Sequence, residues 1–256
     1  MGVQFSLLAI ALLPAILFTM PPQSPSEPRV RIAPTGRSEL PVMPYNERTH
    51  AVFEPLFTDP AWARMRPFAM VLQNLTAHPI LTLSVRWTYT HASGKPRTSD
   101  FRRDSLFSDG GAFTPAGTMV LIVPGAVMFS TLVNAGRIQA APSIEAAEEL
   151  TLSSNLAASI DAVILGDGEV IGPDLTGTLA WMKAGELAIS TVARTAAEAK
   201  AAGQDPGRAI ANLVAQTPND TTGDWIRRLA RMPNITTESF WRVFNQRPAV
   251  PPLHRK

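Results

Sequence analysis

Apolar and polar residues alternate most regularly between Ile80 and Thr90. The apolar positions are Leu81, Leu83, Val85, Trp87 and Tyr89, and the polar ones between them are Thr82, Ser84, Arg86, Thr88 and Thr90. Strict alternation places the large apolar side chains on one face of a strand. One polar face is typical of an antiparallel sheet, because parallel sheets are usually covered on both faces. The pattern therefore predicts an antiparallel strand with Trp87 in the core and its polar face in water.

Shorter apolar runs surround this strand and are separated by turn residues. They cover residues 68–73, 119–123, 127–133, 160–165 and 169–171. Asn74–Pro79 and residues 92–96 supply turn chemistry on either side of the long strand, and Arg102–Arg103 falls in a predicted loop. The glycines of Gly166-Asp167-Gly168 permit the positive φ of a tight hairpin. About seven short strands with turns between them predict an immunoglobulin-like antiparallel β-sandwich.

The pattern changes to a helical period after residue 173. Asp174 is a predicted cap for a helix that ends at Gly203, and Asp205-Pro206 begins a second one. Two further segments follow, one with Trp225 and Ile226 and one that opens at Thr237. Residues 143–150 predict a short helix between strands. The predicted fold class is mainly β, an immunoglobulin-like antiparallel β-sandwich followed by a C-terminal bundle of short α-helices.

The first part of the sequence predicts export. Residues 1–26 carry no charged side chain, and Phe5–Met20 is almost wholly apolar. This length is close to that of a secretory hydrophobic region and short of the roughly 20 residues of a membrane span. We therefore expect residues 1–20 to be a signal peptide or membrane anchor.

The remaining domain boundaries follow from prolines and from the change of period. Seven prolines between residues 21 and 44 predict a proline-rich tether over residues 21–48, because proline cannot join a helix or the interior of a sheet. The sandwich domain is then expected over residues 49–173 and the helical tail over residues 174–246. Prolines also predict a disordered tail over residues 247–256.

Composition excludes several classes of function. Charged residues are 17% of the chain and the net charge is +2, so no basic footprint for nucleic acid is expected. The absence of cysteine excludes disulfides, thiol catalysis and cysteine-ligated metals. The four histidines are isolated in the sequence: His50, His78, His91 and His254. Signatures of serine nucleophiles and phosphate loops are also missing. The sequence thus predicts no catalytic residue, no cofactor and no metal site.

One acidic segment invites a sharper hypothesis. Asp161, Asp167, Glu169 and Asp174 lie in and around the predicted hairpin. Carboxylates are the ligands that calcium prefers, but these four do not match a calcium-binding loop and hairpin acids are usually solvated. The spacing of the glycines is also wrong for a dinucleotide site, because a strand rather than a helix follows Gly168. Calcium binding by these four carboxylates is therefore only the less favoured interpretation.

Several segments together resemble a known group of proteins. They are Asn74–Thr90, Gly94-Lys95, Ile122–Gly125, Asp161–Gly168 and Val170–Asp174. The chain is similar in these segments to uncharacterised exported bacterial β-sandwich proteins with a D-x-V-I-x-x-D-G-x-x-x-G-P-D hairpin. The resemblance implies export and a β-sandwich with helices, and it assigns no catalytic or binding residue.

The leading functional hypothesis is an exported, non-enzymatic binding or structural protein of the cell envelope or exterior. Its location would be periplasmic, extracellular or anchored by the first segment, with membrane contact only through residues 1–20. Its partner would be an unidentified protein or envelope component, not nucleic acid. Two alternatives stay open. One is a secreted hydrolase that uses the four hairpin carboxylates. The other is a membrane-anchored scaffold whose helical tail docks a partner through Trp225, Phe240 or Trp241.

Overall fold

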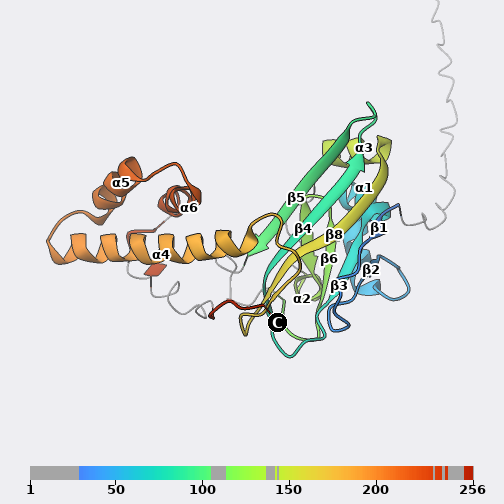
Figure 1. The fold of residues 1–256 in the computed structure, drawn as a ribbon, viewed down its shortest axis with the longest axis horizontal. Helices are drawn as coiled ribbons and strands as arrows, with labels where there is room; N and C mark the ends of the chain where they lie inside the picture. Colours follow the sequence, from blue (N-terminus) through green and yellow to red (C-terminus); the bar gives the residue numbers. More distant parts are fainter. Residues whose placement is uncertain are drawn as a thin grey trace, which may run out of the picture.

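Two mainly antiparallel sheets form the body of the protein, and a helical arm extends from it (Figure 1). The computed structural model describes residues 29–104, 114–136, 142, 144–232, 234–237, 240–241 and 251–255. The expected signal peptide or anchor over residues 1–20 lies outside these residues.

The first sheet has the strand order β1-β8-β4-β5, with β9 paired to β8. Its strands are β1 (Arg31–Ile32), β8 (Ser154–Leu165), β4 (Ile80–Thr90), β5 (Pro96–Asp104) and β9 (Val170–Ile171). The second sheet has the order β2-β3-β6-β7, formed by β2 (Val42–Pro44), β3 (Met70–Gln73), β6 (Met119–Val123) and β7 (Ala126–Phe129). Strand β1 runs parallel to β8, and the other pairs are antiparallel.

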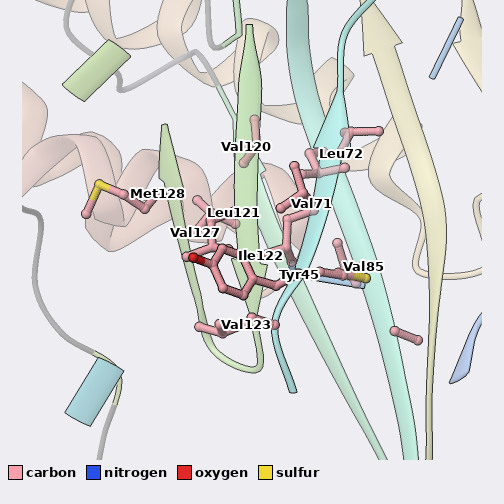
Figure 2. Close-up of a cluster of buried hydrophobic side chains, with 14 of the residues drawn as sticks. Tyr45, Val71, Leu72, Val85, Val120, Leu121, Ile122, Val123, Val127 and Met128 are labelled. Carbon is pink, nitrogen blue, oxygen red and sulfur yellow. The ribbon is translucent and has the colours of Figure 1, made fainter. Parts of the chain in front are cut away.

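Both sheets contribute side chains to a first hydrophobic core. Figure 2 shows Val71 and Leu72 of β3 beside Val120–Val123 of β6, with Val85 of β4 on the facing sheet. The short helices of the body also pack against this core, and they add Phe53, Leu56 and Trp62 to it. They are η1 (Ala51–Thr58), α1 (Pro60–Met65), η2 (Arg66–Phe68), α2 (Ser130–Asn134) and α3 (Ile144–Leu152). Trp87 is completely buried in the same core, which confirms its predicted position.

The polar face of β4 differs from the expectation. Thr82 and Ser84 are fully buried, because the start of the helical arm covers them. The Thr82 hydroxyl donates to the Met182 sulfur over 3.1 Å, and the Ser84 and Thr176 hydroxyls are 2.9 Å apart. The prediction of a water-facing surface therefore fails for this half of the strand.

The predicted tether is wrong for residues 29–48. Val30 and Leu40 are buried in the first core, β1 pairs with β8 and β2 pairs with β3. Both strands lie at the edges of their sheets, where proline is tolerated because one side of the strand needs no hydrogen-bond donor. The prolines thus exclude this segment from a sheet interior without excluding it from the fold. Residues 21–28 lie outside the described part of the chain.

The helical arm has its own core. It contains α4 (Thr178–Ala201), α5 (Pro206–Gln216) and α6 (Thr221–Ala230). Buried residues of all three helices form a second core with Leu81, Ile164 and Val170 of the first sheet. Asp205 caps α5 as predicted, accepting hydrogen bonds from the amides of Gly207 and Arg208. Phe240 and Trp241 are helical. No helix in the described residues is long and apolar enough to cross a membrane.

The predicted fold class therefore needs correction. Helices are too extensive for a mainly β protein, and α4 has 24 residues, so the arm is not a bundle of short helices only. The chain has a mixed α/β fold of two mainly antiparallel sheets and several helices.

Three predicted segments also differ. Arg102–Arg103 lies in strand β5 rather than a loop, and the run 127–133 divides into β7 and α2. Residues 251–255 of the predicted disordered tail pair with the β8–β9 turn.

Substitution of Leu40 by alanine tests whether the segment before residue 49 belongs to the fold. Leu40 is fully buried, so Leu40→Ala should lower the free energy of unfolding by about 2–5 kcal/mol. Leu75→Ala is the matched control, because Leu75 is 51% exposed. Urea denaturation of both variants measures the difference. An equally small loss of unfolding free energy in both variants would support the original prediction that residues 29–48 are a tether.

Candidate functional site

The turn between β8 and β9 is a tight hairpin, as predicted. The Leu165 amide donates to the Glu169 carbonyl and the Gly168 amide donates to the Leu165 carbonyl, over 3.0 and 2.9 Å. Gly168 has a φ of +92°, which side chains rarely adopt. Gly166 has no positive φ, so that part of the prediction is wrong. Glycine is instead required at position 166 because the Pro79 ring packs against it, and an added Cβ would lie 2.8 Å from that ring.

A cleft of about 330 Å³ lies beside this hairpin. Its walls come from three parts of the chain: residues 37–40, residues 75–78 and residues 165–171. The polar lining includes Arg37, Glu39, His78, Asp167 and Glu169, and the apolar lining includes Leu40, Leu75, Leu165 and Ile171. We refer to this feature as the hairpin cleft.

Ion pairs arrange the charged groups of the hairpin cleft. Arg37 pairs with Glu169, whose side chain is only 6% exposed. Such a buried carboxylate requires a partner because its desolvation is costly. Asp167 accepts a hydrogen bond from the Glu169 amide at 3.0 Å, and its other oxygen lies 3.5 Å from His78 Nε2. Three carboxylates and one guanidinium therefore line the cleft, so acidic groups outnumber basic ones there.

Glu39 contributes to this acidic excess from the rim. A hydrogen bond from its own backbone amide and one from the Ser38 hydroxyl lower the pKa of Glu39 below its ordinary value. The Glu39 carboxylate is therefore ionised at neutral pH.

Asp161 and Asp174 serve a different purpose from the carboxylates of the cleft. Asp161 is buried and accepts hydrogen bonds from the amides of Leu175 and Thr176, at 2.8 and 3.0 Å, and from the Thr176 hydroxyl at 2.5 Å. Asp174 accepts from the amides of Thr178 and Leu179. Its side chain therefore satisfies the first amides of α4, but the helix begins later than predicted and its N-cap position is Gly177 rather than Asp174. Together these two carboxylates organise the connection between β9 and α4.

The hydrogen bonds of Asp161 decide its ionisation. Burial raises the pKa of this carboxyl group. The hydrogen bonds from Thr176 and Leu175 and the charge of Arg86 together lower the pKa by more than burial raises it. The net result is a pKa below the ordinary value for aspartate. Asp161 is therefore a structural anion and has the opposite tendency to a general acid.

The four suspected calcium ligands thus belong to two separate features. Asp167 and Glu169 line the hairpin cleft, while Asp161 and Asp174 bind the backbone around the start of α4. Within the ranges that the structure describes, no group of three or more histidine, aspartate or glutamate residues is arranged to hold a metal ion. The structure does not assemble the proposed calcium site.

His78 is, with Arg37 and Glu39, a site residue that sequence reasoning missed. It belongs to the Asn74–Pro79 turn, which the Gly166 amide joins to the hairpin by donating to the Pro79 carbonyl at 2.7 Å. The turn signal was visible in the sequence, but the contact with Asp167 was not. His50 differs from it, since it is buried and its Nδ1 accepts from the Asn46 amide; burial lowers the pKa of His50.

Of the aromatic residues suspected of docking a partner, Trp225 is buried inside the arm, and Phe240 and Trp241 are partly buried. Trp225 is fully buried, donates to the Trp181 carbonyl and packs on the Trp181 ring at 4.6 Å. Arg102 of β5 lies over the Trp181 ring at 5.1 Å. Phe240 and Trp241 pack against the second core. Trp225 therefore joins α6 to α4, Trp181 joins α4 to the body through Arg102, and the buried Trp225 offers no docking surface in this fold.

Comparisons with protein-family models, curated proteins and solved structures find no match to this chain.

Acidification tests the role of Asp161. A carboxyl group whose pKa is lower in the folded state stabilises the fold above its unfolded pKa of about 3.9, and this contribution is lost as the pH falls through the folded value. Asp161→Asn should cost about 1–3 kcal/mol at pH 7, because an amide cannot satisfy the same three donors. It should also show a smaller loss of stability below about pH 4 than the parent protein.

Urea denaturation at a series of pH values measures both effects. Asp224→Asn is the control, because the Asp224 side chain is 63% exposed and its pair with Arg227 contributes little. Identical pH profiles for Asp161→Asn and the parent would contradict the structural role of Asp161.

Substitution of Gly168 separates backbone strain from close packing. Gly168→Ala and Gly94→Ala both place a side chain at positive φ, which costs about 1–2 kcal/mol. An added Cβ at Gly94 meets no atom within 4 Å, whereas at Gly168 it would lie 2.3 Å from the Pro252 carbonyl oxygen. Thermal or urea unfolding should therefore show a greater loss for Gly168→Ala. Equal losses would show that residues 251–255 do not pack on the hairpin.

Proposed function

We propose that this protein is an exported, non-enzymatic binding protein that recognises a partner through the hairpin cleft. The observation that carries the proposal is the composition of this cleft, which joins an acidic rim to an apolar floor. A concave site with a few placed polar groups is the usual form of a binding site.

The chemistry of the lining favours a cationic group with an aliphatic stem. Leu40, Leu165 and Ile171 are buried at the cleft, and Leu75 is 51% exposed beside them. A lysine or arginine side chain from a partner would cover Leu75 with its methylene groups and place its charge near Glu39 and Asp167. The partner would then be a protein or envelope component with an exposed basic side chain. The excess of acidic groups disfavours nucleic acid, whose phosphates require cations.

Export and the architectural class belong to the same proposal. The apolar run Phe5–Met20, the absence of charge before residue 27 and the resemblance to exported bacterial proteins support export. An immunoglobulin-like sandwich architecture for the two-sheet body is supported by its mainly antiparallel pairing and its shared core.

A hydrolase is the second candidate, and one contact favours it. The imidazole of His78 lies 3.5 Å from Asp167 in the same cleft as Glu169. The other two suspected carboxylates are engaged by the backbone around α4. An enzyme would therefore have to use Asp167, His78 and Glu169, with Glu169 already paired to Arg37.

Peptide titration followed by NMR tests the binding proposal. An acetylated, amidated Ala-Lys-Leu-Ala peptide should shift the amide signals of Leu75, His78 and Asp167, and the analogue with glutamate should not. Asp167→Asn should weaken the binding about tenfold, which corresponds to one charged hydrogen bond of about 1.4 kcal/mol. Added salt should weaken it as well.

Asp224→Asn controls for a general loss of negative charge, because Asp224 lies on α6. Equal responses to the lysine and glutamate peptides, or shifts confined to the arm, would contradict the proposal. Cleavage of the peptide that is lost in His78→Gln would favour the hydrolase instead.

A further inference from the structure

Residues 251–255 lie beside the hairpin as an added strand. Glu169 and His254 form a parallel bridge. The Val170 amide donates to the His254 carbonyl at 2.8 Å, and the His254 amide donates to the Gly168 carbonyl at 2.9 Å. This is the hydrogen-bonding pattern by which an extended peptide joins the free edge of a sheet.

Gly168 makes room for this added strand. A Cβ at residue 168 would meet the Pro252 carbonyl oxygen at 2.3 Å and the Pro251 ring at 3.3 Å. Any other residue would therefore push the strand away from the hairpin edge. This edge of the hairpin thus permits close backbone contact, and we refer to the surface formed by residues 168–170, Pro173 and Asp174 as the strand groove.

Two side chains of the added strand contact the groove. Leu253 packs against the second core, to which Val170 and Met182 belong. The Arg255 guanidinium lies 3.5 Å from the Pro173 carbonyl and 4.0 Å from the Asp174 carboxylate, whose side chain is 9% exposed. The strand groove therefore contacts an apolar side chain at one position of the strand and a basic side chain two positions later.

We propose that the strand groove is a binding site for an extended segment of a partner protein with an apolar residue followed, two residues later, by arginine or lysine. Residues 251–255 occupy this site as an intramolecular competitor. The choice of partner follows from the occupant, because Leu253 and Arg255 display the chemistry that the groove accepts.

The contacts of residues 251–255 suit a replaceable occupant. Pro252, His254 and Arg255 are exposed, while Pro251 and Leu253 are half-buried. A covalently attached strand needs only weak contacts, because its effective concentration at the groove is high. A partner that adds contacts beyond these five residues would compete with it. This site shares the hairpin with the hairpin cleft, but it uses the backbone groups of residues 168–170 and the start of α4, whereas the cleft uses the side chains of Asp167 and Glu169.

A labelled peptide with the sequence Pro-Pro-Leu-His-Arg-Lys tests the proposal on the full chain. The variant Leu253→Asp should release the internal strand, and the peptide should bind this variant at least tenfold more tightly than the parent by fluorescence anisotropy. Peptides with aspartate for leucine or glutamate for arginine should not bind. Adding Gly168→Ala to the variant should abolish binding, whereas adding Gly94→Ala should leave it unchanged.

Amide hydrogen exchange at Val170 gives an independent measurement. This amide should be protected in the parent, exchange faster in Leu253→Asp and regain protection when the peptide is added, because its acceptor is the His254 carbonyl. Unchanged protection in Leu253→Asp, or absence of peptide binding to that variant, would overturn the proposal. A dimer of the parent that dissociates in Leu253→Asp would overturn the choice of partner and assign the groove to a second copy of this chain. None of these measurements depends on the lysine peptide, so either site can fail alone.

Discussion

The buried carboxylate of Asp161 is the constraint on which the arrangement of sheet and arm depends. It lies in the middle of β8 and receives three hydrogen bonds from Leu175 and Thr176, so the chain after β9 must return over the first sheet. That return brings Thr176 onto Ser84 and covers the polar face of β4. The start of α4 then lies where Leu81 and Ile164 can join the second core. A single anion thus fixes where the helical arm begins.

The hairpin between β8 and β9 is consequently contacted on two sides. On one side Arg37 and His78 bring the earlier parts of the chain to Glu169 and Asp167. On the other side the backbone of His254 pairs with residues 168–170. The first proposed site uses the side chains of Asp167 and Glu169, whereas the second uses the backbone groups of Gly168 and Val170, so the two sites use different atoms of the same turn. The hairpin is short, yet both Arg37, from the segment before residue 49, and His254, from the C-terminal segment, contact it.

The sequence was informative where local physics determines structure. Alternation predicted β4 and the burial of Trp87, and the cap at Asp205 predicted the start of α5. Strand β5 was missed because an exposed edge strand shows no apolar alternation. The cleft was only half predictable: Asp167 and Glu169 were singled out, but Arg37 lies 132 residues from its partner Glu169. Such a contact is created by the pairing of β1 and β2 with the sheets, which leaves no local pattern.

The length of α4 has a mechanical consequence. At a rise of 1.5 Å per residue, its 24 residues extend for about 36 Å, with α5 and α6 packed along it (Figure 1). Over that length, a rotation of about 10° at the junction with the first sheet would move the far end of the helix by about 6 Å. The junction between the arm and the first sheet is formed at Asp161, Arg102 and Trp181, close to the strand groove. At the far end of α4, the displacement from a rotation of that size would exceed the pitch of one helical turn, which is about 5.4 Å.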